Sequence, residues 1–228
     1  MEQRQVTTTP PPNGTRHRVR QAAKRARYDR DTLDAILDAS PVGHVAFVHE
    51  GWPQSIPTAI ARVDDGLWLH GSRSSRLYRV LAAGEPVAVS VCLVDALVKA
   101  RSAFHCSMNY RSAVVFGRGE PVKGAAKREV LDRFTERLIP GSMGDYRDHL
   151  AKELKATELI RLPLDQASCK IRTGDPIDDD EDLDLPHWAG ILPLAIVAGT
   201  PRPADNLPTG TTLPAAMRER FGGTRRKP

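Results

Sequence analysis

Short apolar runs rich in β-branched and aromatic residues recur along the chain. These runs cover residues 44–49, 54–63, 66–71, 86–94, 110–122 and 157–172. Runs of this length and composition are typical of β-strands. The breaks EGWP and Asp64-Asp65-Gly66 between the first three runs are typical of hairpin turns, so these strands are expected to form an antiparallel meander.

Apolar residues at helical spacing occupy the segments between some of these runs. The first helix is expected to start at Asp31 and to end before Pro41, with Leu33, Ile36 and Leu37 on one face. A second helix is expected to close at Gly84, and the charged, periodic segment 123–138 is typical of an amphipathic helix. The later helices are expected over residues 75–84, 123–138 and 145–154.

Five or six strands joined mostly by hairpins, with single helices between them, favour an antiparallel barrel over a doubly wound sheet. The fold class is therefore expected to be mainly β, of the α+β type. No GxGxxG follows a strand and no GxxxxGK[ST] is present, so the phosphate-binding turns of Rossmann and P-loop proteins are missing from the sequence.

Both ends of the chain differ in composition from its middle. Residues 1–26 contain the stretch TTTPPPNGT, in which prolines remove backbone donors, and they are expected to form a disordered basic arm. Residues 27–198 are expected to form one folded domain. Residues 199–228 are Pro-rich and basic and are expected to form a loose tail.

The net charge of +5 comes from the basic arm rather than from the folded domain. Residues 1–30 hold eight Arg and Lys against Glu2 and Asp29, so the rest of the chain is close to neutral. The arm lacks the interleaved aromatic residues of a single-strand binder. These features argue against nucleic acid as a partner, and a DNA-binding function would depend on residues 1–26 alone.

Three cysteines without CxxC spacing argue against a disulfide framework and against a structural zinc site, and no metal ligand set is expected. Reduced thiols fit the cytoplasm. No apolar run is long enough to span a membrane, so the protein is expected to be cytoplasmic, without a membrane partner.

The segment HGSRSSR, residues 70–76, follows a predicted strand and leads into a predicted helix. Free amide groups at a helix start, serine hydroxyls and the guanidinium of Arg73 or Arg76 together suit a phosphate monoester. An N-capped helix with surface arginines is the alternative that the residues alone leave open.

Several blocks in order resemble a known family. They are YDRDTLDAILD, GHVAFV, IPTAIAR, LHGSRSSR, ARSAFHCSMNYRSAVVFG, KATELIRLPLDQASCKIRTGDPIDDDED and HWAGILPL. Over residues 27–195 the chain is similar to the FMN-binding split-barrel proteins of the pyridoxamine 5′-phosphate oxidase-like type, in the branch that includes nitroimidazole-resistance proteins. The resemblance implies a six-stranded antiparallel split β-barrel with peripheral helices, and a homodimer that holds FMN at the subunit interface.

The resemblance also implies roles for individual residues. Ser75 and Arg76 would grip the FMN phosphate, and His70 and Ser72 would lie beside the ribityl phosphate. Pro57, Thr58 and Ala59 would line the isoalloxazine edge through backbone groups. The remaining residues implied to contact the flavin are Arg111, Ser112 and Trp188, and the candidates for a catalytic group are Tyr110 and His105.

For Arg111, a structural ion pair with a carboxylate is the alternative to a cofactor contact. Trp188 has simple core packing as its alternative. In relatives a second histidine often stands where this chain has Cys106, which argues against a histidine-based proton donor at His105. Lys99 also departs from the apolar residue that is common in relatives.

Two functions fit the sequence. The first is an FMN-dependent oxidoreductase acting on an unidentified small molecule, with nitro-compound reduction as one activity suggested by likeness. The second is a non-catalytic protein that binds flavin, haem or a deazaflavin. If the cofactor were haem, His105, His70 and His49 would be the candidate iron ligands.

Overall fold

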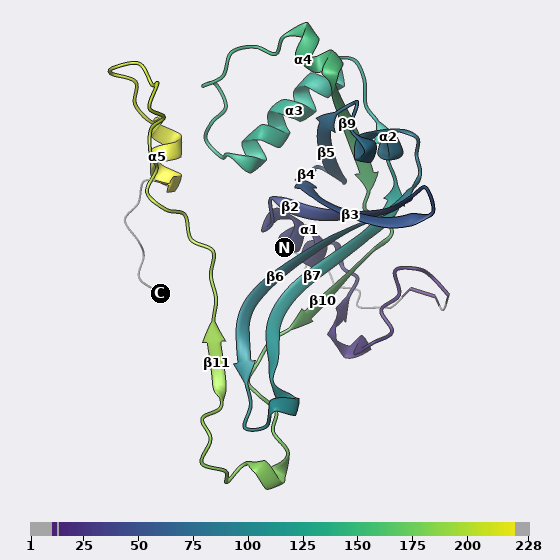
Figure 1. The fold of residues 1–228 in the computed structure, drawn as a ribbon, viewed down its shortest axis with the longest axis vertical. Coiled ribbons are helices and arrows are strands. Elements are labelled where there is room, and N and C mark those ends of the chain that lie inside the picture. The colour runs from purple at the N-terminus through teal and green to yellow at the C-terminus, as the bar shows by residue number, and fades with distance from the viewer. Residues whose placement is uncertain (1–10, 13, 222–228) are drawn as a thin grey trace, which may run out of the picture.

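The computed structural model describes residues 11–12 and 14–221, and it is a mainly β, α+β structure with antiparallel sheets (Figure 1). The strands are β1 Ala26–Arg27, β2 Val42–His49, β3 Trp52–Ala59, β4 Ala61–Val63, β5 Gly66–Ser72, β6 Pro86–Lys99, β7 Ser107–Arg118, β8 Glu120–Pro121, β9 Thr157–Pro163, β10 Ala167–Arg172 and β11 Gly190–Pro193. The helices are α1 Arg30–Asp38, α2 Arg76–Ala82, α3 Ala125–Leu138, α4 Ala151–Ala156 and α5 Ala215–Phe221, with short 3₁₀ turns η1 Ala23–Arg25, η2 Ala103–His105 and η3 Asp180–Asp182.

The strands form two sheets. The larger sheet has the order β1-β10-β7-β6-β2-β3, with β11 added to β6, and the smaller has the order β4-β5-β9-β8. Every described strand pair is antiparallel, as the hairpin pattern predicts. The predicted fold class is confirmed at this level. The count of six barrel strands and the dimer stay predictions.

Three runs that the sequence analysis treats as single strands each serve both sheets. The run 110–122 is interrupted at Gly119, so β7 belongs to the larger sheet and β8 to the smaller. The run 54–63 is interrupted at Ile60, so β3 pairs with β2 and β4 pairs with β5. The run 157–172 is interrupted at residues 164–166, so β9 and β10 also belong to different sheets. The backbone crosses between sheets at these points, where Ile60 is 1% exposed and anchors the crossing in the core.

The helix expected over 145–154 is wrong in its first half, because α4 begins only at Ala151. Leu150 has extended backbone angles, and its N–H donates to the carboxylate of Glu153 at 3.0 Å. Arg147 also pairs with Glu153, at 2.5 Å. These contacts hold residues 147–150 outside the helix, and side-chain capping of this kind has no signal in hydrophobic spacing.

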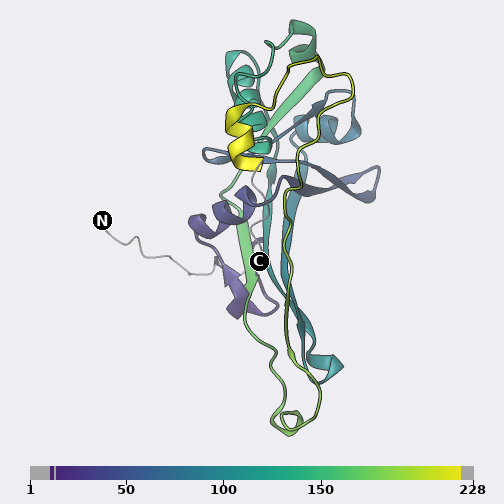
Figure 2. The same cartoon turned by 90° about the vertical axis from the view of Figure 1, so that its left-hand side faces the viewer.

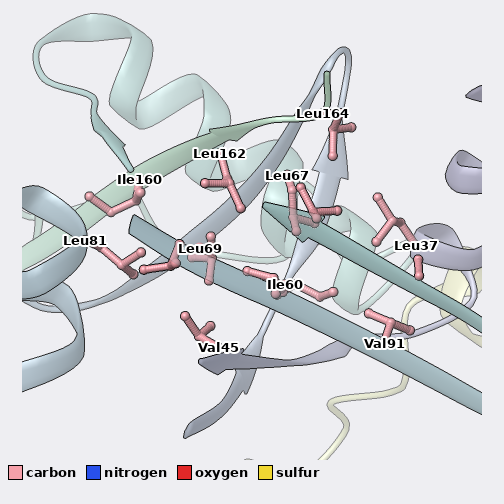
Figure 3. Close-up of a cluster of buried hydrophobic side chains, with 14 of the residues drawn as sticks. Leu37, Val45, Ile60, Leu67, Leu69, Leu81, Val91, Ile160, Leu162 and Leu164 are labelled. Carbon is pink, nitrogen blue, oxygen red and sulfur yellow. The ribbon is translucent and has the colours of Figure 1, made fainter. Parts of the chain in front are cut away.

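The first helix follows its pattern closely. The Asp29 carboxylate caps α1 by accepting from the Thr32 N–H at 2.8 Å, and Leu33, Ile36 and Leu37 are buried. They join the main core with side chains from both sheets, shown in Figure 3. The labelled core residues are Leu37, Val45, Ile60, Leu67, Leu69, Leu81, Val91, Ile160, Leu162 and Leu164. A second cluster, around Phe134, packs α3 against β4 and β5.

Burial separates the three cysteines by reactivity. Cys169 is 2% exposed, and burial raises the pKa of its thiol to about 12, whereas Cys92 and Cys106 are exposed. The thiolate is the reactive form of cysteine, and the Cys169 thiol stays protonated at pH 8. Cys169 is therefore expected not to react with a disulfide reagent such as dithiobis(nitrobenzoate) at pH 8 until urea unfolds the protein. Counting titrated thiols with and without urea checks this. Labelling of native Cys169 at the rate of Cys106 would contradict the burial described.

Beyond a bulge between Val94 and Ala96, β6 and β7 extend away from the core as a long hairpin (Figures 1 and 2). We call this hairpin, residues 95–109, the arm. Its tip carries η2, and β11 pairs along it from Gly190 opposite Lys99. The arm therefore places residues of the SAFHCSMNYRS segment far along the molecule from α2.

Each end of the described chain makes contacts with residues nearer its middle. Within the N-terminal segment 1–26, which was predicted to be disordered, the Val19 N–H donates to the hydroxyl of Tyr28 at 2.9 Å. Within the tail predicted over 199–228, α5 lies close to Gly141. The predicted disorder and domain bounds stay predictions, and residues 1–10, 13 and 222–228 lie outside the described residues. Among the described helices, none is long and apolar enough to cross a bilayer.

Candidate flavin site

The turn from β5 into α2 gathers hydroxyl groups. We call residues 71–76 the phosphate loop, after the ligand that the sequence analysis predicts for it. Ser75 caps α2 and accepts from the Tyr78 N–H at 3.3 Å, which leaves its hydroxyl proton free to be donated. The hydroxyls of Ser72 and Ser74 lie 2.8 Å apart and are exposed. The loop therefore presents several hydroxyl donors on one short stretch of surface.

The two arginines of the phosphate loop have different partners. Arg73 pairs with the carboxylate of Glu158 at 3.0 Å, so its charge is compensated within the protein. Arg76 is exposed and donates to the side-chain amide oxygen of Gln54 at 2.9 Å. Among the described residues no carboxylate pairs with Arg76. Its guanidinium keeps a full charge and free donors beside the serines, which suits a phosphate.

Tyr78 fixes the phosphate loop to the end of β3. Its hydroxyl donates to the backbone oxygen of His70 and lies 3.3 Å from the hydroxyl of Thr58. Burial raises the pKa of Tyr78, so the phenol stays protonated and available for these bonds. One buried side chain thus holds β3, β5 and α2 at a fixed spacing.

The packing of the Tyr78 ring leaves no room for a side chain at Gly71. A Cβ atom there would meet the Tyr78 ring at 2.2 Å. Gly71→Ala is therefore expected to lower the free energy of unfolding by about 1–3 kcal/mol, as overpacked sites do. Urea unfolding measures it, and Gly199→Ala is the control because nothing lies within 4 Å of that position. Equal stability of the two variants would contradict the close packing of Tyr78.

The side chain of His70 points away from the phosphate loop. Its ring packs edge-on against Phe134 of α3, with centroids 4.5 Å apart, and burial lowers its pKa. The Nδ1 atom is buried without a hydrogen-bond partner among the described residues. The backbone oxygen of His70 belongs to the site through Tyr78, and the predicted contact with ribityl phosphate stays a prediction.

A broad uncharged surface begins beside β3. We call the side of β2, β6 and β7 that faces away from the core the outer face. The name covers only residues 42–48 of β2, 88–94 of β6 and 110–116 of β7, because Arg118 and Lys99 lie beyond these segments. Its residues are Val42, His44, Ala46, Val48, Ala88, Ser90, Cys92, Val94, Tyr110, Ser112, Val114 and Phe116, all exposed or half-buried. The residues opposite, such as Val45 and Val89, are in the core. Half-exposed sheet faces of one domain usually carry charged residues, so a face without them indicates an interaction surface.

The predicted flavin residues divide between the two sides of the larger sheet. Pro57 lies opposite His44, and Ala59 lies opposite Val42, so both border the outer face, which also carries Tyr110 and Ser112. Thr58 points to the other side, toward Tyr78. Only some of the flavin residues predicted from the sequence therefore lie on the outer face.

Arg111 and the arm residues lie apart from the phosphate loop. Arg111 forms a two-point ion pair with Asp95, at 2.7 and 3.0 Å, which lowers the pKa of that carboxyl. At the tip, His105 lies 3.0 Å from Asp179. Trp188 is 58% exposed, and its backbone oxygen accepts from the amine of Lys99 at 2.8 Å. Their predicted cofactor contacts stay predictions.

Comparison with known proteins fits this geometry. A family model described as pyridoxamine 5′-phosphate oxidase matches residues 29–171, which include β3, the phosphate loop and the outer face. The chain belongs to the pyridoxamine 5′-phosphate oxidase family. It is thus a member of a flavin-binding family with the split-barrel fold.

Two solved structures are about 40% identical to this chain and match most of its length. The flavocytochrome Anf3 from Azotobacter vinelandii is 38% identical, with a TM-score of 0.85 over 90% of this chain and 95% of that one. An FAD- and haem-binding protein from Mycobacterium smegmatis is 41% identical, with a TM-score of 0.83 over 86% of this chain and 97% of that one. A candidate 5-nitroimidazole antibiotic resistance protein from Bacteroides thetaiotaomicron, at 20% identity and a TM-score of 0.54, shares the fold. A search of curated proteins finds no match.

Three residues of this family member were missed by the sequence analysis. Gln54 and Tyr78 act through partners distant in sequence, and nothing in their local pattern signals those contacts. For His44 the sequence did contain a signal, in the alternation of residues along β2. The core residues Val45 and Phe47 alternate with it along β2, and this alternation places His44 on the exposed side.

Proposed function

We propose that the protein is a homodimeric flavin-dependent redox protein that uses FAD and also carries haem. The observation that supports the flavin site best is the charge of Arg76, which has no carboxylate partner among the described residues and stands beside three serine hydroxyls. The group recognised there is the ribityl phosphate, which FMN and FAD share. FAD is proposed over the predicted FMN because a relative 41% identical to this chain binds FAD.

The ring of the flavin is placed by family likeness against Pro57, Thr58 and Ala59. Two of these border the outer face, so the ring would lie at the edge of that surface. A second copy of the chain is proposed to cover the outer face. This would remove uncharged surface from water and would enclose the flavin between subunits, as the position of Pro57 and Ala59 requires if the ring is to be shielded.

The two groups of predicted site residues support a shared site. Ser75 caps α2 and Arg76 is its first residue. His105 lies on the arm, and Arg111 and Trp188 contact arm residues Asp95 and Lys99, in a separate region of the fold (Figure 1). Tyr110 and Ser112 lie on the outer face itself. In a dimer built on this face, residues of one chain's arm would approach the flavin of the other.

A bound flavin supplies hydride or electron transfer at its ring. The residues of this chain would hold the phosphate at Arg76, fix the ring edge through β3 and exclude water with the partner's surface. Tyr110 and His105 remain the candidates for a group that touches a substrate. An acid or base from the protein is not required for electron transfer, so the absence of a triad among the described residues agrees with this proposal.

Haem is proposed as a second cofactor because both relatives near 40% identity carry a name that implies it, one as a flavocytochrome and one as an FAD- and haem-binding protein. The fit in this chain requires an imidazole that is free to bind iron and a flat apolar surface beside it. The outer face provides both, since His44 stands on it.

Absorbance spectroscopy of untagged protein tests the proposed function. Flavin bands that are bleached by a nicotinamide or ferredoxin-type donor and restored by an electron acceptor are expected. Heat-released cofactor, separated by chromatography, identifies FAD or FMN. A flavin that no donor reduces would favour a storage protein, and protein that takes up no flavin would contradict the proposal.

A further inference from the structure

Seven histidines are present, and most of them are engaged or enclosed. His105 and His149 each hold a carboxylate, at 3.0 Å from Asp179 and 2.8 Å from Asp132. His70 packs edge-on against Phe134. His49 stands 3.8 Å from Glu50, and His17 has a buried Nδ1 atom. Each of these five rings lies near a carboxylate, packs against an aromatic ring or has a buried nitrogen.

The remaining two are His44 and His187, which are both exposed and make no side-chain hydrogen bond or ion pair among the described residues. Their surroundings differ in charge. His187 follows Asp182 and Asp184 in an acidic loop, which would repel the two propionates of haem. His44 stands among uncharged side chains on a sheet.

The neighbours of His44 form a surface suited to a flat macrocycle. Its cross-strand partner on β6 is Ser90, and the next residue across the sheet is Val114 on β7. Along β2 it is flanked on the same side by Val42 and Ala46. These side chains are short, so the imidazole stands above them. Cofactor sites combine apolar walls of this kind with a few placed polar groups, here the imidazole.

His44 also lies beside the proposed flavin. It pairs across the sheet with Pro57, one of the residues assigned to the isoalloxazine edge. Residues directly opposite on neighbouring strands have Cβ atoms about 4.5–5.5 Å apart. A haem on His44 would therefore lie next to the flavin ring, at a distance suited to electron transfer between the two cofactors.

We propose that His44 is the axial haem ligand of this protein and that the haem lies on the outer face, between the two subunits and beside the flavin ring. The inference rests on the proposed flavin–haem function and deepens it. The electrons balance in two successive steps: the two-electron-reduced flavin would release its electrons one at a time, and each electron would convert ferric haem to ferrous haem. An electron acceptor then returns the haem to the ferric state.

Titration of the flavin-loaded dimer with hemin tests the assignment. The wild type is expected to give a Soret band and one hemin per chain. Loss of an outer-shell partner of a metal ligand already costs about 10–100-fold in metal affinity. His44→Ala is therefore expected to weaken hemin binding by more than about a hundredfold, and added imidazole is expected to restore the Soret band. His44→Cys is expected to retain hemin with a shifted, thiolate-type band.

The controls are His49→Ala on the same strand and His187→Ala, both with flavin content and dimer mass measured. They are expected to bind hemin as the wild type does. A His44→Ala variant with wild-type affinity and spectrum, or loss of hemin in a control instead, would overturn this assignment and leave the flavin–haem function standing. A flavin-loaded wild type that binds no hemin would overturn both.

Discussion

Arg76→Ala is expected to weaken flavin binding by about ten- to a hundredfold. The variant removes one charge-assisted hydrogen-bond donor to the phosphate, which is worth about 1.5–3 kcal/mol, and each 1.4 kcal/mol changes affinity about tenfold. Nothing in the core depends on this side chain, because it is exposed and contacts only the amide of Gln54 by hydrogen bonding. Quenching of flavin fluorescence during titration of apoprotein measures the dissociation constant.

Arg79→Ala is the matched control, since Arg79 is exposed on the same helix and lies one turn further along α2. It removes the same formal charge from the surface, and its flavin affinity is expected to remain within about twofold of the wild type. If both variants lose the same affinity, the effect is one of general charge. If Arg76→Ala binds flavin as tightly as the wild type, the phosphate lies elsewhere.

Ala46→Asp is expected to convert the dimer into a monomer. Ala46 is exposed on the outer face, between Ser55 and Ala88, so the folded monomer can carry a carboxylate there. In the proposed dimer both copies of the new charge would be buried without a partner. Such juxtaposed or unpaired charges cost several kcal/mol, which corresponds to a dissociation constant raised by at least roughly a hundredfold.

Sedimentation or light scattering across a concentration series measures this shift. Ala126→Asp is the control, because Ala126 is exposed at the start of α3 and outside the outer face. Flavin affinity is expected to fall together with dimer formation in Ala46→Asp, since the partner encloses the ring. A stable dimer of Ala46→Asp would show that another surface makes the interface.

Hydrophobic spacing predicted the helices and strands that bury an apolar face. It located α1 from Leu33, Ile36 and Leu37, and α3 from its charged, periodic segment, within a few residues. It could not show that three of the runs change sheets, at Ile60, at Gly119 and at residues 164–166. The sheet change depends on long-range pairing, which local pattern does not contain.

The candidate site was predictable where it is local in sequence. Ser72, Ser75 and Arg76 lie within five positions, and a strand followed by a helix fixes their relation. Gln54 and Tyr78 contact the loop from β3 and α2, and only the folded structure brings them together. The ion pair of Arg111 with Asp95 depends on the bulge in β6, which brings a carboxylate from an adjacent strand to the guanidinium.

Native mass spectrometry of the untagged protein tests the central claim most directly, because one spectrum reports the number of chains and the cofactors they retain. The account predicts a species of two chains with two flavin nucleotides, and a corresponding Arg76→Ala species that has lost flavin. A single chain without flavin, in protein supplied with FAD and FMN, would contradict it.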